Sequence, residues 1–339
     1  MANRGSVNLV AATGRIACLG ATALTLAAPA AVSLPALQWS PWLLGLLALG
    51  VPHGAADHRV GSELGRPAGF GFYAGYLLAA AAVLALWFAS PAAASVGFLV
   101  VAALHFGQGD VYWSRQFGLA ARSGSPGYRA SLLLARSALP VGLPLLAHPG
   151  ELSGAADALA ARLFGREGWS IAPGAVGAGL VALGIVVGLQ VGWACWLGRR
   201  GDGATRRAAA VEVAETLLLA LTFAVTPPVL ALGVYFNAWH SPRHVVRLLL
   251  LEPRTRDLLA AGRPLTAFGL FWRRALPMTC GALAIGVALG LAVARSAASV
   301  ADLGLVALVA LSALTLPHVL VVAWMDARQG VWSPRPAPG

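Results

Sequence analysis

Long apolar runs recur along the whole chain, and they limit the folds that are open to it. A helix needs about 20 mostly apolar residues to cross a bilayer, and runs close to that length follow one another with short arginine-bearing connections. Only 11% of the 339 residues are charged, against about a quarter in soluble proteins, and no polar stretch is long enough for a soluble domain. The sequence therefore predicts an all-α, polytopic bundle of nine or ten transmembrane helices. The expected spans are 16–36, 40–56, 70–90, 93–108, 131–149, 173–197, 210–226, 229–243, 276–295 and 302–325.

The eighth expected span is short and follows two prolines, Pro227 and Pro228. Proline removes a backbone hydrogen bond, so this span either continues the seventh helix or is a broken helix. The first reading gives nine spans and the second gives ten.

Arginines are distributed unevenly between the two sets of loops. With the N-terminus in the cytoplasm, the loops assigned outside carry only Arg162 and Arg166, whereas the segment 244–275, assigned inside, carries six arginines. This is the positive-inside pattern, and it predicts a plasma-membrane protein with a cytoplasmic N-terminus and a cytoplasmic, proline-rich tail over 327–339. The formal net charge is +11, but the arginines are scattered and not gathered into a stripe, so we expect no nucleic-acid partner.

The N-terminal run allows two interpretations. Residues 16–32 resemble a signal peptide, because Arg4 and Arg15 precede an apolar core that small residues follow. The apolar run continues to about residue 36 and another begins almost at once, which favours a retained first helix. We therefore expect an N-terminal segment, 1–38, and one membrane domain, 39–326. The chain has no lysine, which excludes an opsin that binds retinal as a Schiff base.

Six of the seven histidines fall toward the same side of the predicted bundle. They are His53, His58, His105, His240, His244 and His318. Polar groups in lipid are costly, so independent placement would rarely bring six of them to one depth on separate helices. The two histidines in "YFNAWHSPRHVVR" stand four residues apart and share a helix face about 6 Å apart, which lets both reach one ion. His148 belongs to the opposite end and is interpreted as an interfacial residue.

Several imidazoles without a thiolate suit Fe(II), Zn(II), Cu or Ni, and on this argument iron and zinc both stay open. Asp57 follows His53 by four residues, and Asp110 follows His105 by five. Either carboxylate could accept an imidazole N–H and fix the tautomer of a ligand, as could Glu212 or Glu215. The alternative for all of them is an ordinary charge at a helix end.

Four motifs, "GVPHGAADH", "HFGQGD", "WHSPRH" and "LPH", occur in this order. The series resembles that of the Brp/Blh family of integral-membrane β-carotene 15,15′-dioxygenases, over residues 50 to about 326. The resemblance implies a non-haem Fe(II) held by His53, His105, His240 and His244. It also implies that O2 cleaves β-carotene at its central double bond into two all-trans-retinal molecules, within the lipid bilayer. Whether a rhodopsin accepts the retinal directly is left open.

Further residues beside these motifs are expected around the iron or in the substrate pocket. His318 is similar to another recurrent histidine of the family, and His58 is similar to its Asp-His ending, while Phe106 and Trp239 neighbour the expected ligands. Pro242 departs from the family pattern. Because proline within a helix removes a hydrogen bond, we expect the histidine pair around it on a bent or partly unwound turn.

Two other classes of function compete with the enzyme. An intramembrane metal or proton transporter would use buried histidines as a relay, but it would prefer polar groups at several depths, and the outer half of the predicted bundle is nearly bare. A haem-binding membrane cytochrome would need paired histidines at matching depths. Histidines at one level are compatible with this too, so their depth alone does not distinguish a cytochrome from the enzyme. The dioxygenase is favoured over both.

Overall fold

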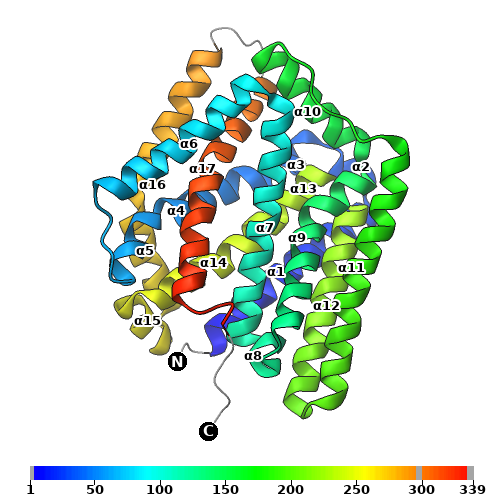
Figure 1. Cartoon of the computed structure of the whole chain (residues 1–339), viewed down its shortest axis with the longest axis vertical. Helices are drawn as coiled ribbons and strands as arrows, with labels where there is room; N and C mark the ends of the chain where they lie inside the picture. Colours follow the sequence, from blue (N-terminus) through cyan, green and yellow to red (C-terminus); the bar gives the residue numbers. More distant parts are fainter. Residues whose placement is uncertain (1–3, 295–299, 334–339) are drawn as a thin grey trace.

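The structure, a computed structural model, describes residues 4–294 and 300–333, and every regular element in these ranges is helical (Figure 1). In chain order the elements are α1 (Arg4–Ala27), α2 (Pro29–Val32), α3 (Pro35–Gly45), η1 (Leu46–Gly50), α4 (Val51–Ala55), α5 (Asp57–Glu63), α6 (Phe70–Ala89), α7 (Pro91–Phe117), α8 (Leu119–Ser123), α9 (Pro126–Ala147), α10 (Pro149–Phe164), α11 (Pro173–Arg200), α12 (Gly203–Val225), α13 (Pro228–Val234), η2 (Tyr235–His240), α14 (Ser241–Leu251), α15 (Pro253–Ala260), α16 (Pro264–Ala294) and α17 (Val300–Arg328).

Seven helices of the described chain are long and apolar enough to cross a membrane, which confirms a polytopic helical membrane protein. These spans are Val7–Ala27, Phe70–Ala89, Pro91–Phe117, Pro126–Ala147, Pro173–Arg200, Gly203–Val225 and Leu305–Arg328. Of the other expected spans, 40–56 and 229–243 fall on two helical segments, α3–η1–α4 and α13–η2–α14, which a π-helical turn interrupts without ending the helix; they are called the two broken helices below. The expected span 276–295 falls on α16, which already begins at Pro264.

The two broken helices share one local design. Each contains a π-helical turn, η1 in the first and η2 in the second, and the α-helix that follows has a proline in its first turn, Pro52 or Pro242. Proline lacks a backbone N–H and fits the start of a helix, while a π turn lets the chain continue without the usual i to i−4 bond. The histidine pair around Pro242 thus lies where a π-helical turn runs into an α-helix, and the bend expected there stays a prediction. Since α3 contacts both α13 and η2, the two broken helices lie side by side.

Several predicted loops are helical, so some of the expected span ends were wrong. Helix α7 continues nine residues past the predicted end at 108, because Asp110, Ser114 and Arg115 face the interior of the protein and are buried. The predicted loop 244–275 consists largely of α14, α15 and the start of α16, and the loop 150–172 contains most of α10. His105 and His244 consequently lie within helices and not at their ends.

The N-terminal helix α1 is packed as part of the bundle. It contacts α12 and η2, and Cys18 is fully buried among aliphatic and aromatic side chains of those elements and of α9. Thr22 of α1 and Thr222 of α12 share a hydrogen bond of 3.0 Å. This helix thus covers the η2 segment that carries His240.

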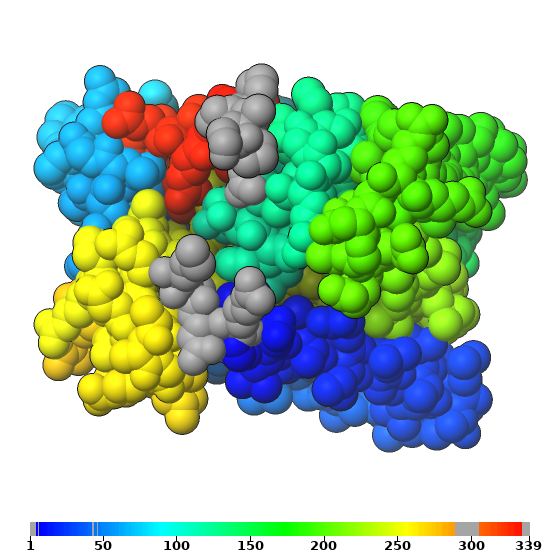
Figure 2. All heavy atoms as spheres, turned by 90° about the horizontal axis from the view of Figure 1, so that it is seen from below, coloured from blue at the N-terminus to red at the C-terminus, as the bar shows by residue number. Residues whose placement is uncertain are grey.

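The arginine-bearing connections gather at one end of the bundle. Helices α8 and α15 and the turn between α11 and α12 lie at that end, whereas α10 lies at the other (Figure 1). Seen from below, the same end is formed by the start of the chain in dark blue, the α14–α15 region in yellow, and helices in teal and green (Figure 2). The regions 111–128 and 150–172 therefore lie at opposite ends, as the span assignment requires, and which end faces the cytoplasm stays a prediction.

Candidate metal centre

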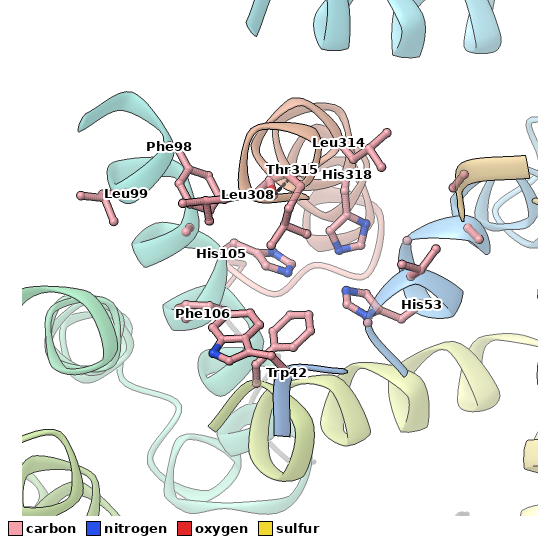
Figure 3. A pocket seen from close by; sticks show the side chains of 18 of the residues that line it. Trp42, His53, Phe98, Leu99, His105, Phe106, Leu308, Leu314, Thr315 and His318 are labelled. Carbon is pink, nitrogen blue, oxygen red and sulfur yellow. Dashed lines mark hydrogen bonds between the residues drawn. The ribbon is translucent and has the colours of Figure 1, made fainter. Parts of the chain in front are cut away.

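Five histidines from five helical segments meet inside the bundle. His53 comes from α4, His105 from α7, His240 from η2, His244 from α14 and His318 from α17. All five are buried, with 3–5% of their surface exposed. Figure 3 shows the rings of His53, His105 and His318 pointing toward one another from three different helices. Isolated buried imidazoles would be costly in an apolar bundle, so this convergence calls for a shared partner.

The distances within the cluster suit one ion. Nitrogen atoms of His53, His105 and His318 all lie within 4.8 Å of one another. His240 Nε2 is 3.0 Å from His105 Nε2. The ring centroid of His244 lies 5.2 Å from that of His53 and 5.2 Å from that of His318. The three nitrogens that lie mutually close thus belong to His53, His105 and His318, and the predicted ligands His240 and His244 lie beside this group.

The unpaired nitrogen atoms of the cluster fit a metal. His105 Nδ1, both ring nitrogens of His244 and His318 Nε2 are buried without a hydrogen-bond partner among the described residues. Two nitrogen ligands bound to one ion at about 2.1 Å lie about 3.0 Å apart when their bonds meet at a right angle. The separation of the Nε2 atoms of His105 and His240 has this value. Neutral imidazoles without thiolates suit Fe(II), Zn(II), Cu or Ni.

Two of the rings are oriented by partners on their outer nitrogen. His53 Nδ1 lies 2.9 Å from the carbonyl oxygen of Leu49, so a proton on Nδ1 leaves Nε2 free toward the cluster. His318 Nδ1 lies 2.9 Å from Asp57 Oδ2, and Tyr76 donates its hydroxyl to the same carboxylate at 3.2 Å. The carboxylate thus pairs with His318 of α17, and not with His53, which precedes it by four residues.

A second buried cluster, of charged side chains, lies directly behind the histidines. Arg243 donates to Asp110 at 2.9 Å and to Glu215 at 3.1 Å, and Arg136 donates to Glu212 at 3.0 Å. All five side chains are buried. Arg243 stands one residue before His244, so this charged cluster fixes the segment that carries the histidine pair to α7, α9 and α12.

Asp110 and Trp239 belong to the charged cluster. The indole Nε1 of Trp239 donates to Asp110 Oδ1 at 3.1 Å, and the Arg243 guanidinium lies 4.0 Å from the Trp239 ring centroid. Among the described residues, the partners of Asp110 are thus arginines and an indole. Neither Arg136 nor Arg243 was predicted as a structural residue, although an arginine inside an apolar run is costly in lipid and indicates a buried partner.

An apolar cavity of about 520 Å³ opens at the histidines. Its lining comes mainly from α4, α6, α7, α10, α16 and α17, and His53, His105 and His318 are among its polar residues. Phe106, Phe98 and Leu308 line it near these histidines, and Figure 3 shows them around the three rings. Such an arrangement can hold a long apolar molecule against a metal ion.

The remaining predicted site residues lie near this cavity. Phe106 lines the cavity, and its ring centroid is 4.9 Å from that of His240. His58 also reaches the lining, with Nδ1 2.8 Å from the carbonyl oxygen of Ala55. Trp239 is not part of the described lining. His148 lies outside the cluster, on the C-terminal side of α9, with Nδ1 3.7 Å from Glu151.

Comparison with known proteins identifies relatives along nearly the whole chain. The sequence profile of the β-carotene 15,15′-dioxygenase family matches residues 44–326. The probable β-carotene 15,15′-dioxygenase Blh from Halobacterium salinarum is 36% identical over 329 residues, which cover 92% of each chain. The probable β-carotene 15,15′-dioxygenase Brp from the same species is 29% identical over 321 residues, or 87% of this chain and 86% of that protein. No solved structure matches the chain significantly. The convergent histidines come from motifs inside the matched region, and the chain belongs to the β-carotene 15,15′-dioxygenase family.

Proposed function

We propose that this protein cleaves β-carotene at its central 15,15′ double bond with O2, at a non-haem Fe(II) site, and releases two all-trans-retinal molecules. The observation that carries the proposal is the meeting of five buried imidazoles beside an apolar cavity, which three of them, His53, His105 and His318, line. The names of the relatives support the reaction, since both are probable β-carotene 15,15′-dioxygenases.

Four histidines hold the iron in this proposal: His53, His105, His240 and His244. The support for His53 is its outer nitrogen, which is bonded to a backbone carbonyl and leaves Nε2 for the ion. His105 and His240 are supported by the 3.0 Å separation of their Nε2 atoms, and His244 by its two unpaired nitrogens. When bound, the iron would supply the activation of O2 for cleavage.

The cavity binds and orients the substrate. β-Carotene has no polar group to recognise, so its position must follow from the shape of an apolar passage. Aromatic side chains such as Phe106 and Trp42 lie near the histidines and would hold the polyene against the ion. The apolar lining also excludes water from the reacting double bond. A proton or metal relay would instead need polar groups along the passage, so the cavity favours the enzyme over the transporter.

The orientation in the membrane forms part of the same proposal. The arginine-bearing connections at one end of the bundle support a cytoplasmic location of that end, in the plasma membrane, with the N-terminus on the same side. Because β-carotene dissolves in the bilayer core, it can enter the cavity from lipid, and retinal can leave the same way. A rhodopsin in the same membrane would then be able to accept it.

The test is production of the full chain in β-carotene-forming cells, followed by pigment extraction and metal analysis of the purified protein. We expect loss of β-carotene, appearance of retinal and iron in the preparation. Replacement of any of the four proposed ligands by Ala should abolish both iron retention and cleavage, whereas His148→Ala should change neither. Full activity of one ligand variant would remove that residue from the set, and unchanged β-carotene with the unmodified chain would refute the proposal.

A further inference from the structure

His318 has the features of a metal ligand, although the proposed four-histidine site does not need it. Its ring is buried, and one of its nitrogens is within 4.8 Å of nitrogens of both His53 and His105. Nε2 has no hydrogen-bond partner among the described residues, while Nδ1 is held by the carboxylate of Asp57. The bond to Asp57 therefore fixes the orientation of the His318 ring, and Nε2 is left free to bind an ion in the cluster.

Asp57 differs from the other buried carboxylates in its partners. Asp110, Glu212, Glu215 and Asp326 each accept a hydrogen bond from an arginine nitrogen at 3.1 Å or less. The recorded partners of Asp57 are His318 and Tyr76. A buried carboxylate without a countercharge is costly. Among the described residues, no arginine donates a hydrogen bond to Asp57, so its negative charge needs another partner. A divalent cation on the far side of the His318 ring would supply that countercharge.

Tyr76 completes a chain of contacts that leads from α6 to the cluster. Its hydroxyl donates to Asp57 Oδ2 at 3.2 Å, and Asp57 Oδ2 lies 2.9 Å from His318 Nδ1. Metal-bound histidines commonly donate their outer N–H to a carboxylate, which fixes the tautomer and makes the inner nitrogen a better donor. The same arrangement is present here: the Tyr76 hydroxyl donates to the Asp57 carboxylate, the carboxylate contacts His318 Nδ1, and His318 Nε2 has no partner among the described residues.

We propose that His318 is a fifth metal ligand through Nε2, and that Asp57 and Tyr76 are positioning residues that hold its tautomer and ring orientation. The inference rests on the proposed function in that it requires a metal ion at the histidine cluster. It adds the C-terminal helix α17 to the metal site and gives the ion a nearby negative charge without a carboxylate ligand. The competing explanation is a purely structural contact between α5 and α17.

Metal binding by the purified full chain in detergent distinguishes the two explanations. Fe(II) is loaded without oxygen and its affinity is measured by competition with a chelator, while Co(II), loaded in its place, reports ligand number and geometry by its visible absorption. The variants are His318→Ala, Asp57→Asn and Tyr76→Phe, and His148→Gln is the matched control because it removes a histidine outside the cluster.

Asp57→Asn should weaken metal binding by about 10- to 100-fold, because a lost carboxylate partner of a ligand has an effect of that size. Tyr76→Phe should act in the same direction but more weakly, since it removes only a bond to the carboxylate. His318→Ala should change the Co(II) spectrum, and added imidazole should restore it by filling the space that the side chain leaves. A spectrum recovered by imidazole also shows that the variant is folded.

Unchanged affinity and an unchanged Co(II) spectrum in both His318→Ala and Asp57→Asn would overturn the inference. If the unmodified chain binds iron and forms retinal in that case, the four-histidine proposal stands and only the role of His318 is lost. If the unmodified chain binds no metal, the proposed function itself fails. An equal loss of affinity in His148→Gln would show that the effect is not specific to the cluster, and would also overturn the inference.

Discussion

The charged cluster next to the histidines leads to a prediction about the stability of the folded protein. Replacement of Asp110 by Asn removes one negative charge and keeps the size of the side chain. In the folded protein Asp110 accepts from Arg243 at 2.9 Å and from the Trp239 indole at 3.1 Å, and Arg136 lies 3.6 Å away. The substitution leaves both arginines buried with less negative charge around them.

The expected magnitude follows from the charge count. Three carboxylates, Asp110, Glu212 and Glu215, face Arg136, Arg243 and the less buried Arg15. Removal of one partner from a buried ion pair costs about 3–5 kcal/mol, because an uncompensated charge is left inside. Arg243 keeps its contact with Glu215 at 3.1 Å, so we expect about 3 kcal/mol from the lower end of that range.

The measurement is the free energy of unfolding in mixed micelles by titration with SDS, for Asp110→Asn, Arg243→Gln and the double variant. The double variant restores neutrality, so its loss should be smaller than the sum of the two single losses by about 1–3 kcal/mol. Asp257→Asn, at an exposed position of α15, is the control and should change stability by less than about 0.5 kcal/mol. A loss below about 1 kcal/mol for Asp110→Asn, or strictly additive single losses, would refute the reasoning.

Three further predictions concern helix packing, the cavity and the orientation. Gly107→Ala should destabilise the fold by about 1–3 kcal/mol, because the new Cβ would lie 2.7 Å from a backbone oxygen of α9. The control is Gly142→Ala, whose Cβ has open space around it and which should be neutral in the same SDS titration. Ala102→Phe, which narrows the cavity, should reduce retinal formation while metal analysis shows iron retained, and loss of both together would contradict this. Arg122→Cys and Glu151→Cys, placed in a cysteine-free background, should react with a membrane-impermeant thiol reagent from opposite sides of intact cells; labelling from one side would refute the orientation.

The membrane class and the convergence of histidines could be predicted from sequence because both depend on patterns that lipid imposes. Apolar runs of sufficient length have few alternatives to a membrane helix, and costly polar residues within them need partners. Six histidines were grouped on this basis, and five of them, all except His58, lie in one buried cluster.

The helix ends could not be predicted in the same way. Hydropathy shows that a residue is polar but not which way it faces, so the pattern predicts that the first residues of a loop include Asp110 and Arg115. In the structure they lie on the inner face of α7. Asp110 accepts a hydrogen bond from Arg243 of α14, and Arg115 donates one to the carbonyl oxygen of Ser333 in the C-terminal segment at 2.8 Å. These contacts join residues far apart in the chain, which spacing rules do not reach.

The partner of Asp57 was missed for a related reason. A separation of four residues predicts a contact with His53 only if one continuous helix carries both. Here α4 ends at Ala55 and α5 begins at Asp57, so the regular helix is interrupted between them. The carboxylate therefore faces α17 and His318, a neighbour that is 261 positions away in sequence.

The π turns of the two broken helices have a consequence for how this protein tolerates insertions and deletions. In an α-helix each residue advances the side-chain direction by about 100°, so the direction of every later residue depends on how many precede it. A π turn contains extra backbone and acts as a phase shift between the parts of the helix on either side of it. Helix α13 can therefore keep the phase that packs Ala231 against its neighbours, while α14 keeps a different phase that aims His244 at the cluster. Deletion of one residue from Tyr235–His240 would therefore turn the π turn into an ordinary α-helical turn and leave α14 facing the cluster, whereas deletion of one residue within α13 would rotate its earlier residues away from their neighbours by about 100°.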